Sequence, residues 1–237
     1  MSNRVIIADR QQGLIGSFFS LGFAVIAGLV LSLVLSIVIE WIGIRFFWRE
    51  EGASHSARMY EAEAAFLEGE LDRNLFSKPS RDFAESFAAT LVDWVWRKTQ
   101  AIVIVEWILS PPPDDSNSIR KTLHGFKDYA EASLTMTAVY GLRLGTLVLA
   151  SPLFFLAALV SIADGFVERD LRKWGGGRES GYMFHIAKRF ILPIVTLFCI
   201  AMLSAPVSVN PVFMTLPAAL ALAVALRLTV ASFKKYL

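Results

Sequence analysis

The chain has 237 residues, of which 55% are hydrophobic and 19% are charged, and its mean hydropathy is +0.52. This balance is too apolar for an ordinary water-soluble domain. The net charge of +2 is too small to indicate direct binding to nucleic acid, and the single cysteine, Cys199, excludes an intrachain disulfide and a cysteine-based metal site.

The first long apolar stretch, Phe18–Ile39, contains no charged residue. As a helix it would measure about 33 Å, enough to cross the roughly 30 Å hydrocarbon core of a bilayer. It is longer than the apolar core of a cleavable signal peptide, and no convincing cleavage site follows it. We therefore expect an uncleaved membrane helix.

Three further stretches have the same character: Leu144–Ala163, Phe190–Ser208 and Val212–Phe233. The last two are separated by a short turn that contains Pro206 and Pro211, so they are expected to form a helical hairpin. The sequence thus predicts an all-α, polytopic membrane protein with four transmembrane helices. The expected segments are a tail (1–17), span one (18–40), a large loop (41–143), span two (144–163), a basic loop (164–189), and the hairpin with a short tail (190–237).

The large loop is expected to be helical. Ser54 is a suitable cap for a helix over about His55–Phe76, in which Tyr60, Ala64 and Leu67 share one apolar stripe. A second helix is predicted from Arg81 to about Leu109.

The apolar part of this second helix, residues 87–109, is interrupted by charges. Asp93, Arg97, Lys98 and Glu106 would each cost about 2.5–3.5 kcal/mol near the centre of a membrane helix. We therefore prefer a partly buried or interface-lying helix to a fifth span. After the proline-rich linker Ser110–Ser118, one helix is predicted from Ile119 to Pro152, and span two is expected to extend through Trp174.

The charges orient these segments. The large loop holds twelve basic and fifteen acidic residues, whereas the loop 164–189 holds six basic and four acidic ones. Because short cytoplasmic loops are enriched in Lys and Arg, we expect both termini and the basic loop in the cytoplasm. In a Gram-negative host the large loop would then be periplasmic and the protein would lie in the inner membrane. Trp41 and Trp48 are expected to anchor the outer lipid–water boundary.

Small residues recur at every fourth position of the first span, which favours close helix packing. Such a face could pack within the chain or against another subunit, and part of the pattern could be chance. The residues are Gly16, Ser20, Ala24, Gly28, Ser32 and Ser36.

Basic residues in the loop 164–189 are expected to contact lipid headgroups or a cytoplasmic partner. They are Arg169, Arg172, Lys173, Arg178, Lys188 and Arg189. The glycines beside them do not make a P-loop, because Arg178 and Glu179 stand where Lys and Ser or Thr are needed.

No catalytic, cofactor or metal site is expected. His55, His124 and His185 are scattered, and no histidine pair has helical metal-ligand spacing. Glu40 and Arg227 are the ionisable residues at the margins of the spans, whereas a pump or transporter more often carries charges near mid-membrane. The sequence therefore disfavours an enzyme and a pump.

Two segments carry a resemblance to a known family. One is Glu40-Trp-Ile-Gly43 with the following run Trp48–Ser56, and the other is the loop from Asp164 to Arg189. In these the chain resembles the integrating conjugative element membrane proteins, bacterial proteins of undefined molecular role. The resemblance covers nearly the whole chain and implies a place in the conjugation apparatus, with no catalytic residues to carry over.

The function expected from these points is a non-enzymatic scaffold or adaptor in conjugative DNA transfer through a type IV secretion-like machine. Expected partners are membrane lipids, other membrane components of that machine including the coupling ATPase, and further copies of the chain, but not nucleic acid. Two alternatives stay open: a small oligomeric channel or transporter, and a sensor or exclusion factor acting through the large loop.

Overall fold

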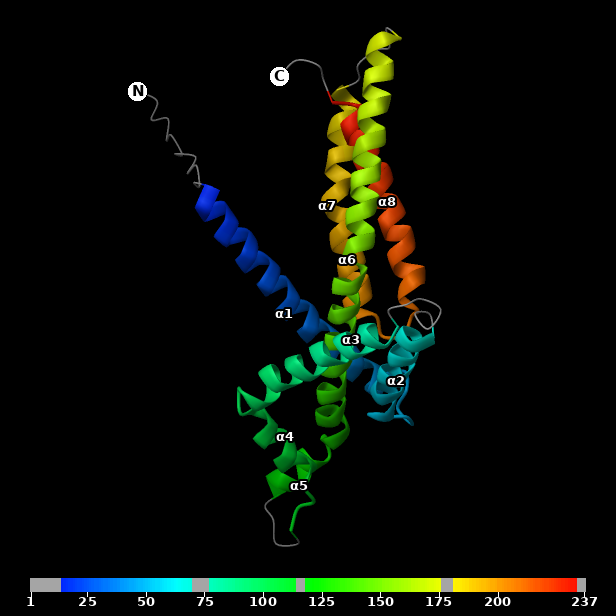
Figure 1. The fold of residues 1–237 in the computed structure, drawn as a ribbon. Coiled ribbons are helices and arrows are strands. Elements are labelled where there is room, and N and C mark those ends of the chain that lie inside the picture. Colours follow the sequence, from blue (N-terminus) through cyan, green and yellow to red (C-terminus); the bar gives the residue numbers. More distant parts are fainter. Residues whose placement is uncertain (1–13, 70–76, 114–117, 176–180, 234–237) are drawn as a thin grey trace, which may run out of the picture.

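The computed structural model describes residues 14–69, 77–113, 118–175 and 181–233, and every regular element in these ranges is a helix (Figure 1). Four of the helices are long and apolar enough to cross a membrane: Gly22–Phe46, Lys127–Trp174, Tyr182–Ser204 and Pro211–Ala231. The expected all-helical fold with four long apolar helices is thus confirmed.

Helix α6 (Lys127–Trp174) is the axis of the molecule. Its 48 residues make a rod of about 72 Å at 1.5 Å per residue. Pro152 lies inside it and does not end it. Such a proline is tolerated in apolar helices because neighbouring groups satisfy the freed carbonyls. Helix α6 reaches Trp174 as predicted and contacts α1, α2, α3, α4, α7 and α8.

Helices α7 (Gly181–Ser204) and α8 (Pro211–Ala231) flank one half of α6 and form the expected hairpin (Figure 1). Helix α7 ends at Ser204, four residues earlier than predicted, because Pro206 disfavours helical geometry in the residue before it. Asn210 caps α8: its side-chain oxygen accepts a hydrogen bond of 2.9 Å from the amide of Val212.

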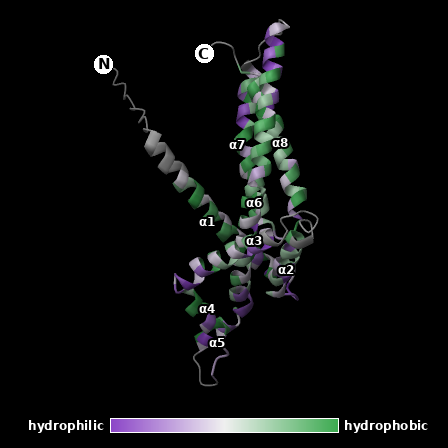
Figure 2. Ribbon diagram, viewed as in Figure 1, coloured by the Kyte–Doolittle hydropathy of each residue, from purple (hydrophilic) through white to green (hydrophobic). Residues whose placement is uncertain are grey.

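Helix α1 (Leu14–Phe46) diverges from the bundle toward its amino-terminal end (Figure 1). Its carboxyl-terminal half packs against α6 and α7, where Leu33 is buried beside Tyr140 of α6 and Leu203 of α7. Phe23 and Ile26 are exposed in its other half. Figure 2 shows that the bundle of α6, α7 and α8 is largely apolar, whereas the helices at the other end of α6 are more polar.

The segment between α1 and α6 folds into short helices around the other half of α6. They are α2 (Ser54–Gly69), α3 (Ser77–Val92), the π-helix η1 (Asp93–Arg97), α4 (Ala101–Leu109) and α5 (Ser118–His124). Helix α2 begins at the predicted cap, and Ala64 and Leu67 of the predicted stripe are buried. Residues 70–76 of the predicted helix lie outside the described residues.

Two predicted helix continuities are wrong. The helix from Arg81 to Leu109 begins at Ser77 and breaks after η1, because Gln100 adopts a left-handed conformation with φ of 63°. The helix from Ile119 to Pro152 breaks at Gly125 and Phe126, where Phe126 leaves the α-helical region before α6 begins. Both breaks redirect the chain, so α4 and α5 fold back beside the start of α6 (Figure 1).

Candidate functional site

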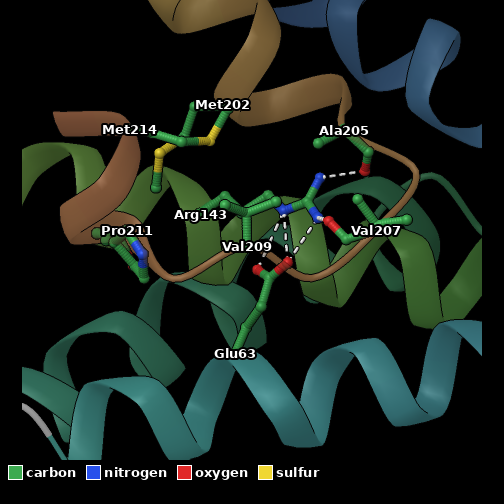
Figure 3. A pocket seen from close by; sticks show the side chains of 9 residues that line it. Glu63, Arg143, Met202, Ala205, Val207, Val209, Pro211 and Met214 are labelled. Carbon is green, nitrogen blue, oxygen red and sulfur yellow. Dashed lines mark hydrogen bonds and ion pairs between the residues drawn. The ribbon is translucent and has the colours of Figure 1, made fainter. Parts of the chain in front are cut away.

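The most strongly organised polar site is a buried ion pair between Arg143 of α6 and Glu63 of α2 (Figure 3). The Arg143 Nε donates to both carboxylate oxygens at 2.9 and 3.0 Å, and Nη2 donates to Oε1 at 2.5 Å. Arg143 is only 3% exposed and Glu63 is 6% exposed. This forked geometry is among the strongest that side chains form.

The other N–H groups of Arg143 bind the turn between α7 and α8. Nη1 donates to the carbonyls of Leu203 at 3.3 Å and Ala205 at 2.8 Å, and Nη2 donates to that of Val207 at 3.2 Å. The Leu203 carbonyl lies in the last turn of α7, where helical partners run out and a cation is favoured, and the other two lie in the turn that follows. We call this set, Glu63, Arg143 and the three carbonyls, the Arg143 junction. It joins α2, α6 and the hairpin at one point.

Burial governs the electrostatics of the junction. It raises the pKa of Glu63 above its ordinary value, and the hydrogen bonds and charge of Arg143 act in the opposite direction. The cavity beside the pair has a volume of about 10 Å³, and Met202, Pro211 and Met214 are among its lining residues. That volume suits about one water molecule. The junction therefore holds helices together through one buried ion pair.

Close backbone packing lies next to the junction. A Cβ placed on Gly141 would be 2.6 Å from the Cα of Ala88, and one placed on Gly145 would be 2.6 Å from the Cα of Ala84. Glycines four residues apart on α6 thus face alanines four residues apart on α3. Small residues at this spacing let two helix backbones approach closely.

A second buried acid lies where α1 meets α2. Glu40 is 1% exposed and lies 3.1 Å from Nδ1 of His55. The ring of Trp48 stacks on His55 with 4.0 Å between centroids. Trp48 fits because Gly43 has no side chain: a Cβ there would lie 1.8 Å from the indole ring.

Polar side chains of α6 form hydrogen bonds with residues of α1 and η1. The hydroxyls of Tyr140 and Ser32 are 2.5 Å apart, and the tyrosine also donates to the carbonyl of Leu29. Trp96 donates to the hydroxyl of Thr137 at 3.0 Å. These bonds fix the rotation of α6 relative to its neighbours.

The structure separates the predicted small residues of α1 into two groups. Ser32 and Ser36 are buried against the rest of the molecule, whereas Ala24 and Gly28 are exposed. The side chain of Ser20 and the surroundings of Gly16 lie outside the description. Their role in packing between subunits stays a prediction.

The two predicted anchor tryptophans are placed differently. Trp41 is 42% exposed and donates to the carbonyl of Tyr129 at 3.1 Å and to Ser133 at 3.0 Å. Trp48 is half-buried in the corner with His55 and Gly43. Trp41 thus keeps the exposure that a boundary residue needs, while much of Trp48 is used for internal packing.

The predicted basic residues surround the ends of α6 and α7. Arg169 lies over the ring of Phe233, Lys188 lies near the ring of Phe184, and Lys173 pairs with Asp170 at 3.1 Å. Arg172 is half-buried, Arg189 is exposed, and Arg178 lies outside the described residues.

Arg227 of α8 forms an ion-paired cluster with two acids of α6. It reaches Asp164 at 2.6 Å and Glu168 at 3.3 Å. Arg227 thus offsets the charge of two of the four acids in the segment 164–189.

The sequence reasoning missed the Arg143 junction. The sequence places Arg143 at the end of the large loop and gives no sign of a partner for Glu63. A signal was present, since Arg143 lies between Leu142 and Leu144 at the very start of an apolar span. The pair Gly141 and Gly145 is likewise a small-residue motif that is visible in the sequence. In the described part of the chain, no group of three or more His, Cys, Asp or Glu side chains is arranged to hold a metal ion.

Comparison with known proteins identifies a family for this chain. A family profile described as "IncC plasmid conjugative DNA transfer protein DtrJ-like" matches residues 47–234, most of the chain. No curated protein and no solved structure matches it. The match begins after α1 and includes the Arg143 junction, and it confirms the conjugation-associated family expected from the resemblance. The chain belongs to the DtrJ-like family of conjugative DNA transfer proteins.

Proposed function

We propose that this protein is a multi-pass inner-membrane scaffold or adaptor of the conjugative DNA-transfer apparatus and that it catalyses no reaction. Membership of the DtrJ-like family supports a role in conjugative DNA transfer, and the four long apolar helices support the membrane location. The proposed partners are other membrane components of a type IV secretion-like machine, including the coupling ATPase, and a second copy of the chain. The element that carries the gene would be integrative or plasmid-borne.

The proposed orientation follows from charge. Arg172 lies in the last turn of α6 and Arg189 in the first half of α7. These ends of the two helices face away from the hairpin turn (Figure 1). Short basic loops are retained in the cytoplasm, so this end is placed inside and the helices α2 to α5 outside. Both termini are then cytoplasmic, with α2 to α5 as the periplasmic domain.

The Arg143 junction is the observation on which the scaffold role depends most. It ties α2 to α6 and to the α7–α8 turn through six hydrogen bonds from one guanidinium. Helix α6 continues from this junction to Trp174. The helices packed at the junction are therefore attached to the same rod that reaches the proposed cytoplasmic end. A partner bound outside is thus held in fixed relation to one bound inside, as a scaffold requires.

Purification from donor cells that carry the element tests this proposal. A tagged full-length chain, extracted in a mild detergent, should bring conjugation components with it, and deletion of the gene should lower the transfer frequency. The variant Arg172→Gln/Arg189→Gln, which removes two positive charges, should insert into the membrane but should no longer copurify with a cytoplasmic component. Unchanged transfer after deletion, or a chain that purifies without any conjugation component, would overturn the proposal.

A further inference from the structure

Helix α4 carries an apolar face that the rest of the molecule leaves uncovered. All its residues except Glu106 are apolar, yet only Val105 is buried. Val103, Ile104 and Trp107 are 56%, 63% and 42% exposed, and at 100° per residue they lie on one side of the helix. A helix that is apolar all round is normally covered on all sides. These three residues form what we call the α4 face.

Contacts at its two ends fix the position of α4 along α6. In η1, which precedes α4, Trp96 donates to Thr137 of α6 at 3.0 Å. At the other end, Nδ1 of His124 lies 2.9 Å from the carbonyl of Ile108, and α6 begins at Lys127. Helix α4 contacts α6, and these two flanking bonds place it alongside the stretch of α6 between residues 127 and 137.

The outer end of α1 contacts the same stretch of α6. Trp41 donates to the carbonyl of Tyr129 and to the hydroxyl of Ser133, both between residues 127 and 137. The apolar part of α1 continues to Phe46, and Trp41, Ile42 and Phe46 are all exposed. If α1 crosses the bilayer as proposed above, its outer end marks the lipid–water boundary, and α4 lies at the same level.

The chemistry around α4 suits that boundary. The Nζ of Lys98 lies 4.8 Å from the ring centroid of Trp94, and the guanidinium of Arg120 lies 5.4 Å from that of Trp107. Tryptophan is enriched at membrane boundaries, and basic groups beside it can reach lipid phosphates. The same aromatic and basic pairing occurs at the end of α1, where Arg45 lies over Phe46.

We infer that α4 is a lipid-contacting helix: its face of Val103, Ile104 and Trp107 is immersed in the outer boundary of the bilayer, with Lys98 directed to lipid phosphates. The periplasmic helices would then rest on the membrane surface and would not extend freely from it. This inference rests on the membrane placement made under Proposed function.

Site-specific labelling of the full chain in lipid nanodiscs tests the inference. In a Cys199→Ala background, single cysteines replace Ile104, Glu61 or Leu220, and each carries an environment-sensitive fluorophore. Glu61 is an exposed charged position on α2, and Leu220 is an exposed apolar position on α8. Quenching is measured with a nitroxide-bearing lipid and with aqueous iodide, and each variant must elute like the parent protein.

The label at Ile104 should be quenched by the nitroxide lipid and protected from iodide, as at Leu220, whereas Glu61 should show the reverse. An Ile104 label open to iodide overturns the inference, and so does one shielded from both quenchers, because a protein surface would then cover α4. If Leu220 is lipid-quenched while Ile104 is not, only this inference fails. If Leu220 is not lipid-quenched either, the membrane placement itself fails.

Discussion

Gly141 of α6 and Ala88 of α3 lie backbone to backbone: a Cβ on the glycine would be 2.6 Å from the alanine Cα and 3.0 Å from its amide nitrogen. Backbone atoms cannot move aside as the end of a flexible side chain can. This contact, repeated at Gly145 and Ala84, therefore sets how closely α3 approaches α6. It makes α3 part of the same packed unit as α6.

The first prediction concerns this crossing. Gly141→Ala should lower the free energy of unfolding by about 1–3 kcal/mol, because the added methyl forces the two backbones apart. The matched control is Gly28→Ala on α1, where a Cβ meets no atom within 4 Å. Thermal unfolding in one detergent, followed by circular dichroism, compares the two. Equal midpoints for the two variants would contradict the close-packing argument.

The second prediction concerns the Arg143 junction. Arg143→Met leaves Glu63 buried without a charged partner and frees three carbonyls, so it should cost about 3–5 kcal/mol of stability. Glu63→Leu combined with Arg143→Met should recover part of that loss, because no uncompensated charge remains. A double-mutant cycle of unfolding free energies measures the coupling. Strict additivity of the two single substitutions would show that the pair does not act as a unit.

The third prediction concerns the corner formed by Gly43, Trp48 and His55. Gly43→Ala should displace the indole, since the new Cβ would overlap the ring position, and thereby uncover His55. The rate of His55 modification by diethyl pyrocarbonate, measured by mass spectrometry, should rise. Gly22→Ala, which meets open space on α1, should leave that rate at the parent value. An unchanged rate in Gly43→Ala would mean that Trp48 does not shield the histidine.

The fourth prediction compares two buried serines one turn apart on α1. Ser32→Ala removes the hydrogen bond to Tyr140 and should cost about 1 kcal/mol. The hydroxyl of Ser36 is buried and has no hydrogen-bond partner among the described residues, so Ser36→Ala should be neutral or stabilising. Unfolding midpoints of the two variants are the measurement. A larger drop in the unfolding midpoint for Ser36→Ala than for Ser32→Ala would show that Ser36, and not Ser32, makes the stabilising hydrogen bond.

The long apolar helices could be predicted because length and composition suffice to identify them. The helix extensions to Trp174 and the turn between α7 and α8 followed from glycine and proline signals. The break at Gln100 could not be predicted, since glutamine carries no preference for the left-handed conformation that it adopts there. Helix propensity is local, whereas this turn is stabilised by the packing of η1 and α4 against α6.

The amino-acid sequence by itself determined the helical class, the four long apolar helices and the unequal distribution of charge along the chain, because each depends on residues near one another in the sequence. Only the tertiary structure decided that Arg143 meets Glu63, 80 residues earlier, and that Gly141 meets Ala88. The physical reason is that a buried charge selects its partner by geometry in three dimensions. The ion pair and the close backbone contact therefore depend on how the helices are arranged in three dimensions.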